Sequence, residues 1–110
     1  MPSIQIEKNG NHALIELREP LALNFAGELR EQLRQLLAEG IFEMSIDLAA
    51  VDLVDSSGIG LLIATHNSLI KAGGSLRVVG VSPEIQHLFK TMRLDRHFAV
   101  EGKTGNGSGS

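Results

Sequence analysis

The chain has 110 residues, of which 43% are hydrophobic and 21% charged, and these fractions are typical of a single globular domain. A net charge of −3 without a basic run argues against a nucleic-acid surface, and the absence of cysteine excludes disulfides and all thiol chemistry. No apolar stretch approaches the roughly 20 residues of a membrane span, and residues 1–10 lack the pattern of a signal peptide, so we expect a cytoplasmic protein without membrane contact.

The amino-terminal residues predict a β-hairpin. Residues 4–6 and 12–17 have the apolar alternation of strands, and the turn-forming residues 8–11 lie between them.

Apolar residues then recur every three to four positions between Pro20 and Gly40, which predicts an amphipathic helix. Asn24 is placed to cap the start of this helix, and Gly40 is placed to end it. The short apolar run of residues 41–48 has the length of a buried strand. The predicted apolar stripe of the helix consists of Ala26, Leu29, Leu33, Leu36 and Leu37.

The second half of the chain predicts two more helices and one or two strands. A helix follows residue 58 and ends at Gly73-Gly74, and residues 76–79 predict the next strand. Ser82-Pro83 predicts the start of a third helix, and residues 98–100 are an optional last strand. The apolar stripe of the helix after residue 58 consists of Ile59, Leu62, Ile63, His66, Leu69 and Ile70.

Strands that alternate with helices predict an α/β fold with parallel pairing. We expect a mixed β-sheet of four to five strands, with an amino-terminal hairpin, packed against three to four helices. Residues 1–101 form a single domain in this interpretation. Residues 102–110, which are rich in glycine and serine, are expected to form a flexible tail.

The helix after residue 58 has a second face of mostly small side chains. On a helical wheel, Leu61, Ala64 and Ser68 lie within about 40° of Ser57, opposite the apolar stripe. Short side chains on an exposed face allow the backbone of another protein to come close. The alternative is that this face has no function.

Two hydroxyl groups precede this helix, in the motif Asp55-Ser56-Ser57-Gly58. A phosphate added there is predicted to face unpaired backbone N–H groups and the positive end of the helix dipole. The same phosphate would lie near the carboxylates of Asp52 and Asp55 and near any docked protein. The motif therefore predicts a charge switch, and ordinary capping by Ser56 or Asp55 is the alternative.

Three segments resemble a known family. Residues 46–48, the motif Asp55-Ser56-Ser57-Gly58-Ile59-Gly60, and residues 72–83 are similar in order and spacing to a STAS domain of the bacterial anti-sigma factor antagonists. The resemblance covers residues 4–100. It implies that Ser57, or alternatively Ser56, is phosphorylated.

The resemblance also implies partner switching. The unphosphorylated antagonist binds an anti-sigma factor serine kinase, a histidine-kinase-like ATPase, and thereby releases a sigma factor. Phosphorylation by this kinase breaks the complex, and a serine phosphatase restores it. The partner-binding surface is predicted to include Asn24, Asp55, Ser56, Ser57, Gly58, Leu61 and Ala64.

One position departs from the family pattern. Members carry an Asp after the second strand that helps to form the partner-binding surface, and Ala22 stands at the matching position here. This difference leaves the choice of partner open, and Asn24 is a candidate for a substitute polar contact.

Catalysis and cofactor binding are not predicted. Ser57 lacks the Gly-x-Ser-x-Gly context of a hydrolase nucleophile, and the four histidines are too scattered for a metal pair. Gly58 and Gly60 do not form a dinucleotide-binding motif, and Gly102-Lys103-Thr104 lacks the glycine that a P-loop requires. We therefore expect no enzyme activity, no cofactor and no metal.

Two other functions stay open. The first is a constitutive STAS scaffold or accessory subunit of a signalling or lipid-transport assembly, in which Ser57 is not modified. The second is an unassisted small-molecule or nucleotide binder. We expect a monomer, because no large exposed apolar stripe is left over in the sequence.

Overall fold

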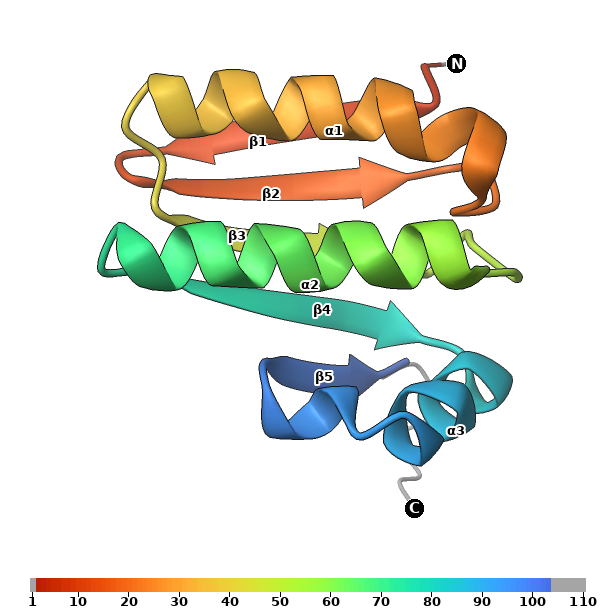
Figure 1. Cartoon of the computed structure of the whole chain (residues 1–110). Coiled ribbons are helices and arrows are strands. Elements are labelled where there is room, and N and C mark those ends of the chain that lie inside the picture. Colours follow the sequence, from red (N-terminus) through yellow and green to blue (C-terminus); the bar gives the residue numbers. More distant parts are fainter. Residues whose placement is uncertain (1, 104–110) are drawn as a thin grey trace.

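The computed structural model describes residues 2–103, which form a five-stranded sheet with helices packed against it (Figure 1). The fold class predicted from the sequence is confirmed. In chain order the elements are β1 (Ile4–Asn9), β2 (His12–Leu17), α1 (Leu23–Ala38), β3 (Glu43–Asp47), α2 (Ser56–Lys71), β4 (Ser75–Val81), α3 (Pro83–Thr91), the short 3₁₀-helix η1 (Leu94–Arg96) and β5 (Ala99–Gly102).

The strands lie in the sheet in the order in which they occur in the chain. β1 pairs antiparallel with β2 as the predicted hairpin, and β2, β3, β4 and β5 pair parallel to one another. Ile46 lies between Ile15 of β2 and Val78 of β4, so the centre of the sheet is apolar on one face. The optional last strand of the sequence prediction is present as β5, which pairs with β4.

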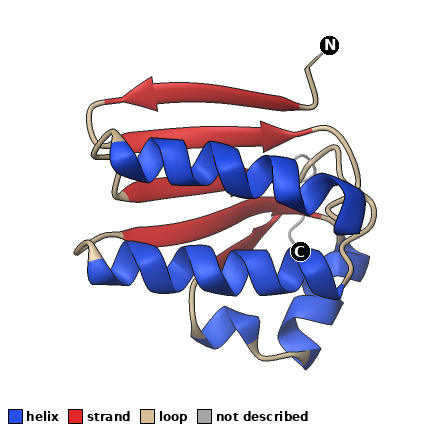
Figure 2. Ribbon diagram, turned by 45° about the horizontal axis from the view of Figure 1, so that its top comes forward, coloured by secondary structure: helices blue, strands red, loops and turns tan. Residues whose placement is uncertain are grey.

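Sequential parallel strands joined by right-handed crossovers place their helices on the same face of the sheet. Figures 1 and 2 show α1 and α2 side by side over that face, with α3 and η1 near β5. The core lies between the sheet and this helical layer. Its sheet side includes Ala13, Ile15, Leu17, Met44, Ile46, Leu76 and Val78, all of which are buried.

The predicted apolar stripe of α1 is confirmed, since Ala26, Leu29, Leu33 and Leu36 are buried and Leu37 packs against them. The predicted cap is wrong. The N-cap position is Ala22, and Asn24 lies one residue inside the helix with its side chain exposed. Residue spacing locates the stripe but not the first hydrogen-bonded residue, because helix ends depend on contacts outside the helix.

Two residues of α2 differ from the helical-wheel prediction. Leu61 was assigned to the exposed small face but is only 3% exposed, because α1 covers this flank of α2. Ile70 was assigned to the apolar stripe but is 54% exposed. The buried arc of α2 is turned toward α1, so Leu61 lies inside it and Ile70, on the opposite side of the predicted stripe, lies outside it.

The sheet continues past the predicted end of the domain at residue 101. Gly102 is the last residue of β5, and the Lys103 backbone N–H donates to the Val81 carbonyl oxygen at 3.1 Å. The other predicted tail residues, 104–110, lie outside the described part of the chain.

The turn from α2 into β4 depends on Gly74. A Cβ atom at this position would overlap the backbone oxygen of Phe42, which accepts a hydrogen bond from the Ser75 N–H at 3.1 Å. Backbone atoms cannot move aside as the end of a flexible side chain can. The carboxyl end of α2 is thus held close to the segment that leads into β3.

We predict that Gly74→Ala lowers the free energy of unfolding by about 3 kcal/mol, since its methyl group forces these two backbone segments apart. Gly60→Ala is the matched control, because nothing lies within 4 Å of a Cβ at Gly60. It should raise stability by about 0.5–1 kcal/mol, the usual gain from Gly to Ala inside a helix. Urea unfolding measures both changes, and equal effects of the two substitutions would contradict the prediction.

Candidate functional site

The predicted site lies where two loops meet at the carboxyl ends of β2 and β3. The loop before α1 and the loop before α2 are joined by backbone hydrogen bonds. The Leu21 N–H donates to the Leu53 carbonyl oxygen at 2.9 Å, and the Asp55 N–H donates to the Leu21 carbonyl oxygen at 3.1 Å. Leu21 and Val54 form a parallel bridge between these contacts. The amino-terminal ends of α1 and α2 are therefore neighbours.

The carboxylate of Asp55 binds the first turns of both helices. Its Oδ1 accepts hydrogen bonds from the Ser57 N–H at 2.9 Å and the Gly58 N–H at 3.2 Å, which makes Asp55 the N-cap of α2. Its Oδ2 accepts from the Leu23 N–H of α1 at 3.2 Å. Because Ala22 has no side-chain acceptor, the first turn of α1 takes its acceptor from the other loop.

Gly58 allows the start of α2 to press directly on this junction. A Cβ atom at Gly58 would overlap the backbone oxygen and the Cγ atom of Leu21. Gly58 is buried, so it shapes the site without being available for contact with a partner.

Ser57 lies one residue inside α2, with a half-buried side chain, and Ser56 before it is exposed. The Ser57 hydroxyl makes no side-chain hydrogen bond to residues 2–103. One part of the sequence prediction is wrong at this point. The N–H groups of Ser57 and Gly58 are not free for a phosphate, because both donate to Asp55.

Two exposed leucines belong to the joined segments at this site and were missed by the sequence analysis. Leu23, the first residue of α1, is 72% exposed, and Leu53, in the loop before α2, is 53% exposed. Their backbone groups take part in the bonds that join the two loops. The sequence did contain a signal for them, because each is a large apolar residue that belongs to no predicted apolar stripe.

The structure brings most of the predicted partner-binding residues to this end of the molecule. Asn24 and Ser56 are exposed there, beside the half-buried Ser57 and Asp55. Ala64 is also exposed but lies two helical turns along α2. Leu61 is buried against α1, so it cannot be the exposed docking residue that the wheel predicted.

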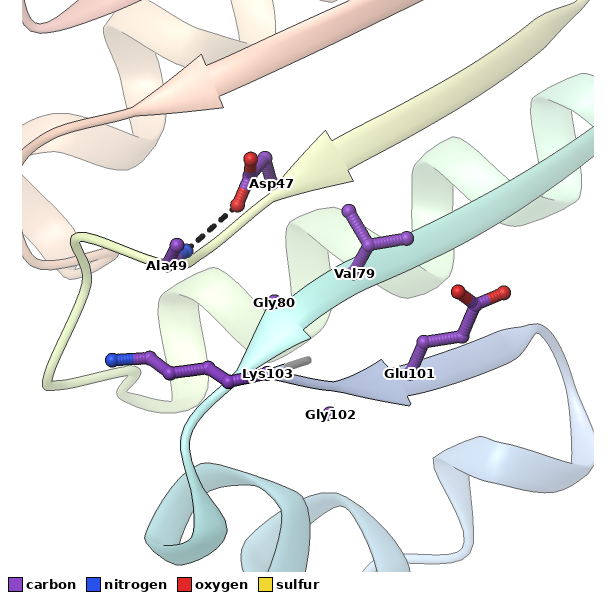
Figure 3. Close-up of a pocket in the computed structure, with 7 residues that line it drawn as sticks. All are labelled: Asp47, Ala49, Val79, Gly80, Glu101, Gly102 and Lys103. Atoms are coloured by element: carbon purple, nitrogen blue, oxygen red, sulfur yellow. Dashed lines mark hydrogen bonds between the residues drawn. The ribbon is translucent and has the colours of Figure 1, made fainter. Parts of the chain in front are cut away.

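A separate hollow of about 380 Å³ lies at the ends of β3, β4 and β5 (Figure 3). Asp47 and Glu101 point into it on the sheet face away from α2, and Lys103 lies at its edge. Both carboxylates already have partners, since Asp47 accepts from the Ala49 N–H at 2.8 Å and Glu101 pairs with Arg77. The hollow therefore offers no free acidic pair.

Residues 2–103 contain neither a metal-binding cluster nor a membrane-spanning helix. In this part of the chain no group of three or more His, Asp or Glu side chains is arranged to hold a metal ion. None of its helices has both the length and the apolar character needed to cross a bilayer.

This α/β domain, with a capped serine motif at the start of α2, matches a known family. The STAS domain model matches residues 3–106, so the chain belongs to the STAS domain family. The anti-sigma-B factor antagonist of Bacillus subtilis (strain 168) is 27% identical over 105 residues, which cover 96% of this chain and 95% of that protein.

Solved structures show the same fold. An anti-sigma factor antagonist from Mycobacterium paratuberculosis superposes with a TM-score of 0.80 at 22% identity, covering 94% of this chain and 87% of its own. The anti-sigma factor antagonist SpoIIAA in its unphosphorylated form gives 0.78 at 18% identity, with 88% and 86% covered. Its phosphorylated form gives 0.72 at 19% identity, with 88% and 89% covered. The resemblance inferred from the sequence is confirmed.

We predict that Asp55→Ala lowers the free energy of unfolding by about 2 kcal/mol, because it removes the cap of α2 and the acceptor of the Leu23 N–H together. Asp52→Ala is the matched control. Asp52 is an exposed carboxylate in the same loop, and its removal should change stability by less than about 0.5 kcal/mol. Thermal and urea unfolding of the two variants test this, and similar losses would show that Asp55 does not hold the junction.

Proposed function

We propose that this protein is an anti-sigma factor antagonist whose binding to an anti-sigma factor serine kinase is controlled by phosphorylation of Ser57. The unphosphorylated form binds the kinase, a histidine-kinase-like ATPase, and thereby releases a sigma factor in the cytoplasm. The kinase phosphorylates Ser57, the complex dissociates, and a serine phosphatase restores the binding form. The protein itself is not an enzyme in this scheme.

The observation that carries the proposal is the position of Ser57. Its side chain is half-buried, and its hydroxyl makes no side-chain hydrogen bond within residues 2–103. It lies in the first turn of the helix whose N-cap, Asp55, also binds the N–H of the exposed Leu23, and the exposed Leu53 lies in the loop before it. A hydroxyl without a hydrogen-bond partner, in a loop junction that carries exposed apolar side chains, suits a surface that is buried in a complex and is open to a kinase. The B. subtilis relative, an anti-sigma-B factor antagonist, supports the class of partner.

Asp55 determines what a phosphate at Ser57 would do. The phosphate adds about −1.5 to −2 charges at pH 7. The two nearest N–H groups of the helix start already donate to the Asp55 carboxylate, so they cannot neutralise the added charge unless that carboxylate moves. The phosphate would therefore present its charge to the partner, and a buried contact of like charges costs several kcal/mol.

Asn24 and Ser56 complete the proposed contact surface. Both are exposed at the end of the helical layer where the two loops meet. Ala22, which replaces the Asp of the family pattern, leaves the first turn of α1 without a carboxylate of its own, so Asn24 is the first polar side chain in that helix. Ser56 is the alternative phosphorylation site, because it is more exposed than Ser57.

We predict that wild type and Ser57→Ala retain a histidine-kinase-like ATPase from a lysate of the source organism, whereas Ser57→Asp retains at least about tenfold less, a loss of about 1.4 kcal/mol. Ser56→Asp tests the alternative site. Asn67→Asp, at an exposed residue of α2 about three turns away, is the matched control for the change in charge and should bind like wild type. Mass spectrometry identifies the bound proteins and, after incubation of the recovered ATPase with ATP, the modified serine.

Other results would contradict the proposal. If wild type and both Ser57 variants retain the same transporter or signalling assembly, Ser57 is not a switch and the constitutive scaffold is correct. If Ser56 carries the phosphate and Ser56→Asp alone abolishes binding, the switch is at Ser56.

A further inference from the structure

The outer surface of the helical layer contains a groove between α1 and α2, which lie side by side (Figures 1 and 2). The groove contains an open hollow of about 180 Å³. Its floor is apolar, since Leu33 and Leu61 are buried there and Leu37 is half-buried. Ligand pockets for small molecules usually measure about 300–1,000 Å³, so this hollow suits one apolar side chain better than a drug-sized ligand.

The α1 rim of the groove carries two cations. Arg30 and Arg34 are exposed, lie one helical turn apart, and both line the hollow. Arg30 has no carboxylate within 4.0 Å among residues 2–103. Arg34 lies 3.9 Å from Glu31, but both side chains are well exposed, and a surface pair of this kind holds an arginine weakly.

The α2 rim carries only short side chains. Ala64 and Ser68 line the hollow there and are exposed, and the Thr65 hydroxyl donates to the Leu61 carbonyl oxygen at 2.8 Å. Among residues 2–103 no acidic side chain lines the groove, although acidic residues exceed basic residues in the whole chain by 13 to 10. The groove is therefore a cationic, apolar strip on an acidic protein.

We propose that this groove binds an acidic amphipathic helix of the partner protein. One apolar side chain of that helix enters the hollow, and two carboxylates spaced one turn apart pair with Arg30 and Arg34. Arginine forms bidentate bonds to carboxylates, and helices in grooves are read through apolar anchors at helical spacing. The short side chains of α2 leave room for the backbone of this helix.

This inference rests on the proposed function, because the partner is the protein whose binding Ser57 controls. Ser57, Ala64 and Ser68 lie on the same side of α2, so one partner can cover the serine and the groove together. The phosphorylation state of Ser57 then decides whether the complex forms, and the charge pairs of the groove decide which partner is accepted.

The first test measures the affinity of the recovered ATPase for the double variant Arg30→Glu/Arg34→Glu by calorimetry. We expect a loss of at least about tenfold, because two attractive charge pairs become repulsive. The matched control is Lys90→Glu/Arg96→Glu, which makes the same change in net charge on exposed residues of α3 and η1. It should change the affinity by less than about threefold.

The outcomes separate this proposal from the Ser57 switch. If Arg30→Glu/Arg34→Glu binds like wild type while Ser57→Asp does not, the groove proposal is wrong and the switch stands. If the arginine variant loses affinity while Ser57→Ala and Ser57→Asp bind like wild type, the groove proposal stands and the switch is wrong. Equal losses in the arginine variant and its control show a general charge effect and overturn the groove proposal.

A second test identifies the occupant of the groove directly. The chain has no cysteine, so Ala64→Cys provides a unique position for a photo-crosslinker. Crosslinking in the complex, followed by peptide mapping, should locate an amphipathic helix of the ATPase with acidic residues three or four positions apart. A crosslink to a basic segment, to a strand, or to a second copy of this chain would overturn the proposal.

Discussion

The hydrogen bonds accepted by the Asp55 carboxylate hold the proposed contact surface around Ser57 in place. This carboxylate accepts hydrogen bonds from the first turns of α1 and α2, and the loops that carry these helices are joined beside it through Leu21. Without this shared acceptor, the N–H group of Leu23 would have no side-chain partner, since Ala22 cannot supply one. One charged group thus links the start of α1, with the exposed Leu23, to the start of α2, with Ser57.

Because α2 is held at both ends, the proposed regulation acts through charge and not through a change of shape. Gly58 brings the start of α2 against Leu21, Gly74 brings its end against Phe42, and α1 covers one flank along its length. A rigid helix presents Ser57 and the α2 rim of the groove in fixed positions, as a partner with matching charges requires. A phosphate therefore needs only to add repulsion at the contact surface.

The periodicity of the sequence was sufficient to predict the helices, the strands and most of the buried core residues. The apolar stripe of α1, the hairpin and the parallel strands were all predicted, because short-range spacing determines which side chains share a face. The serine motif was predicted at the start of α2 for the same reason. Leu61 and Ile70 were assigned to the wrong environments, since a helical wheel contains no information about the second helix that covers one flank of α2.

The sequence by itself determined the fold class, the family and the location of the two serines, since these depend on residue types at short, regular spacing. Only the tertiary structure showed that Asp55 caps two helices, that Leu23 and Leu53 are exposed beside Ser57, and that Arg30 and Arg34 line a groove with α2. These features join residues that are tens of positions apart in the chain. Their positions depend on how the loops and helices pack, which local periodicity does not specify.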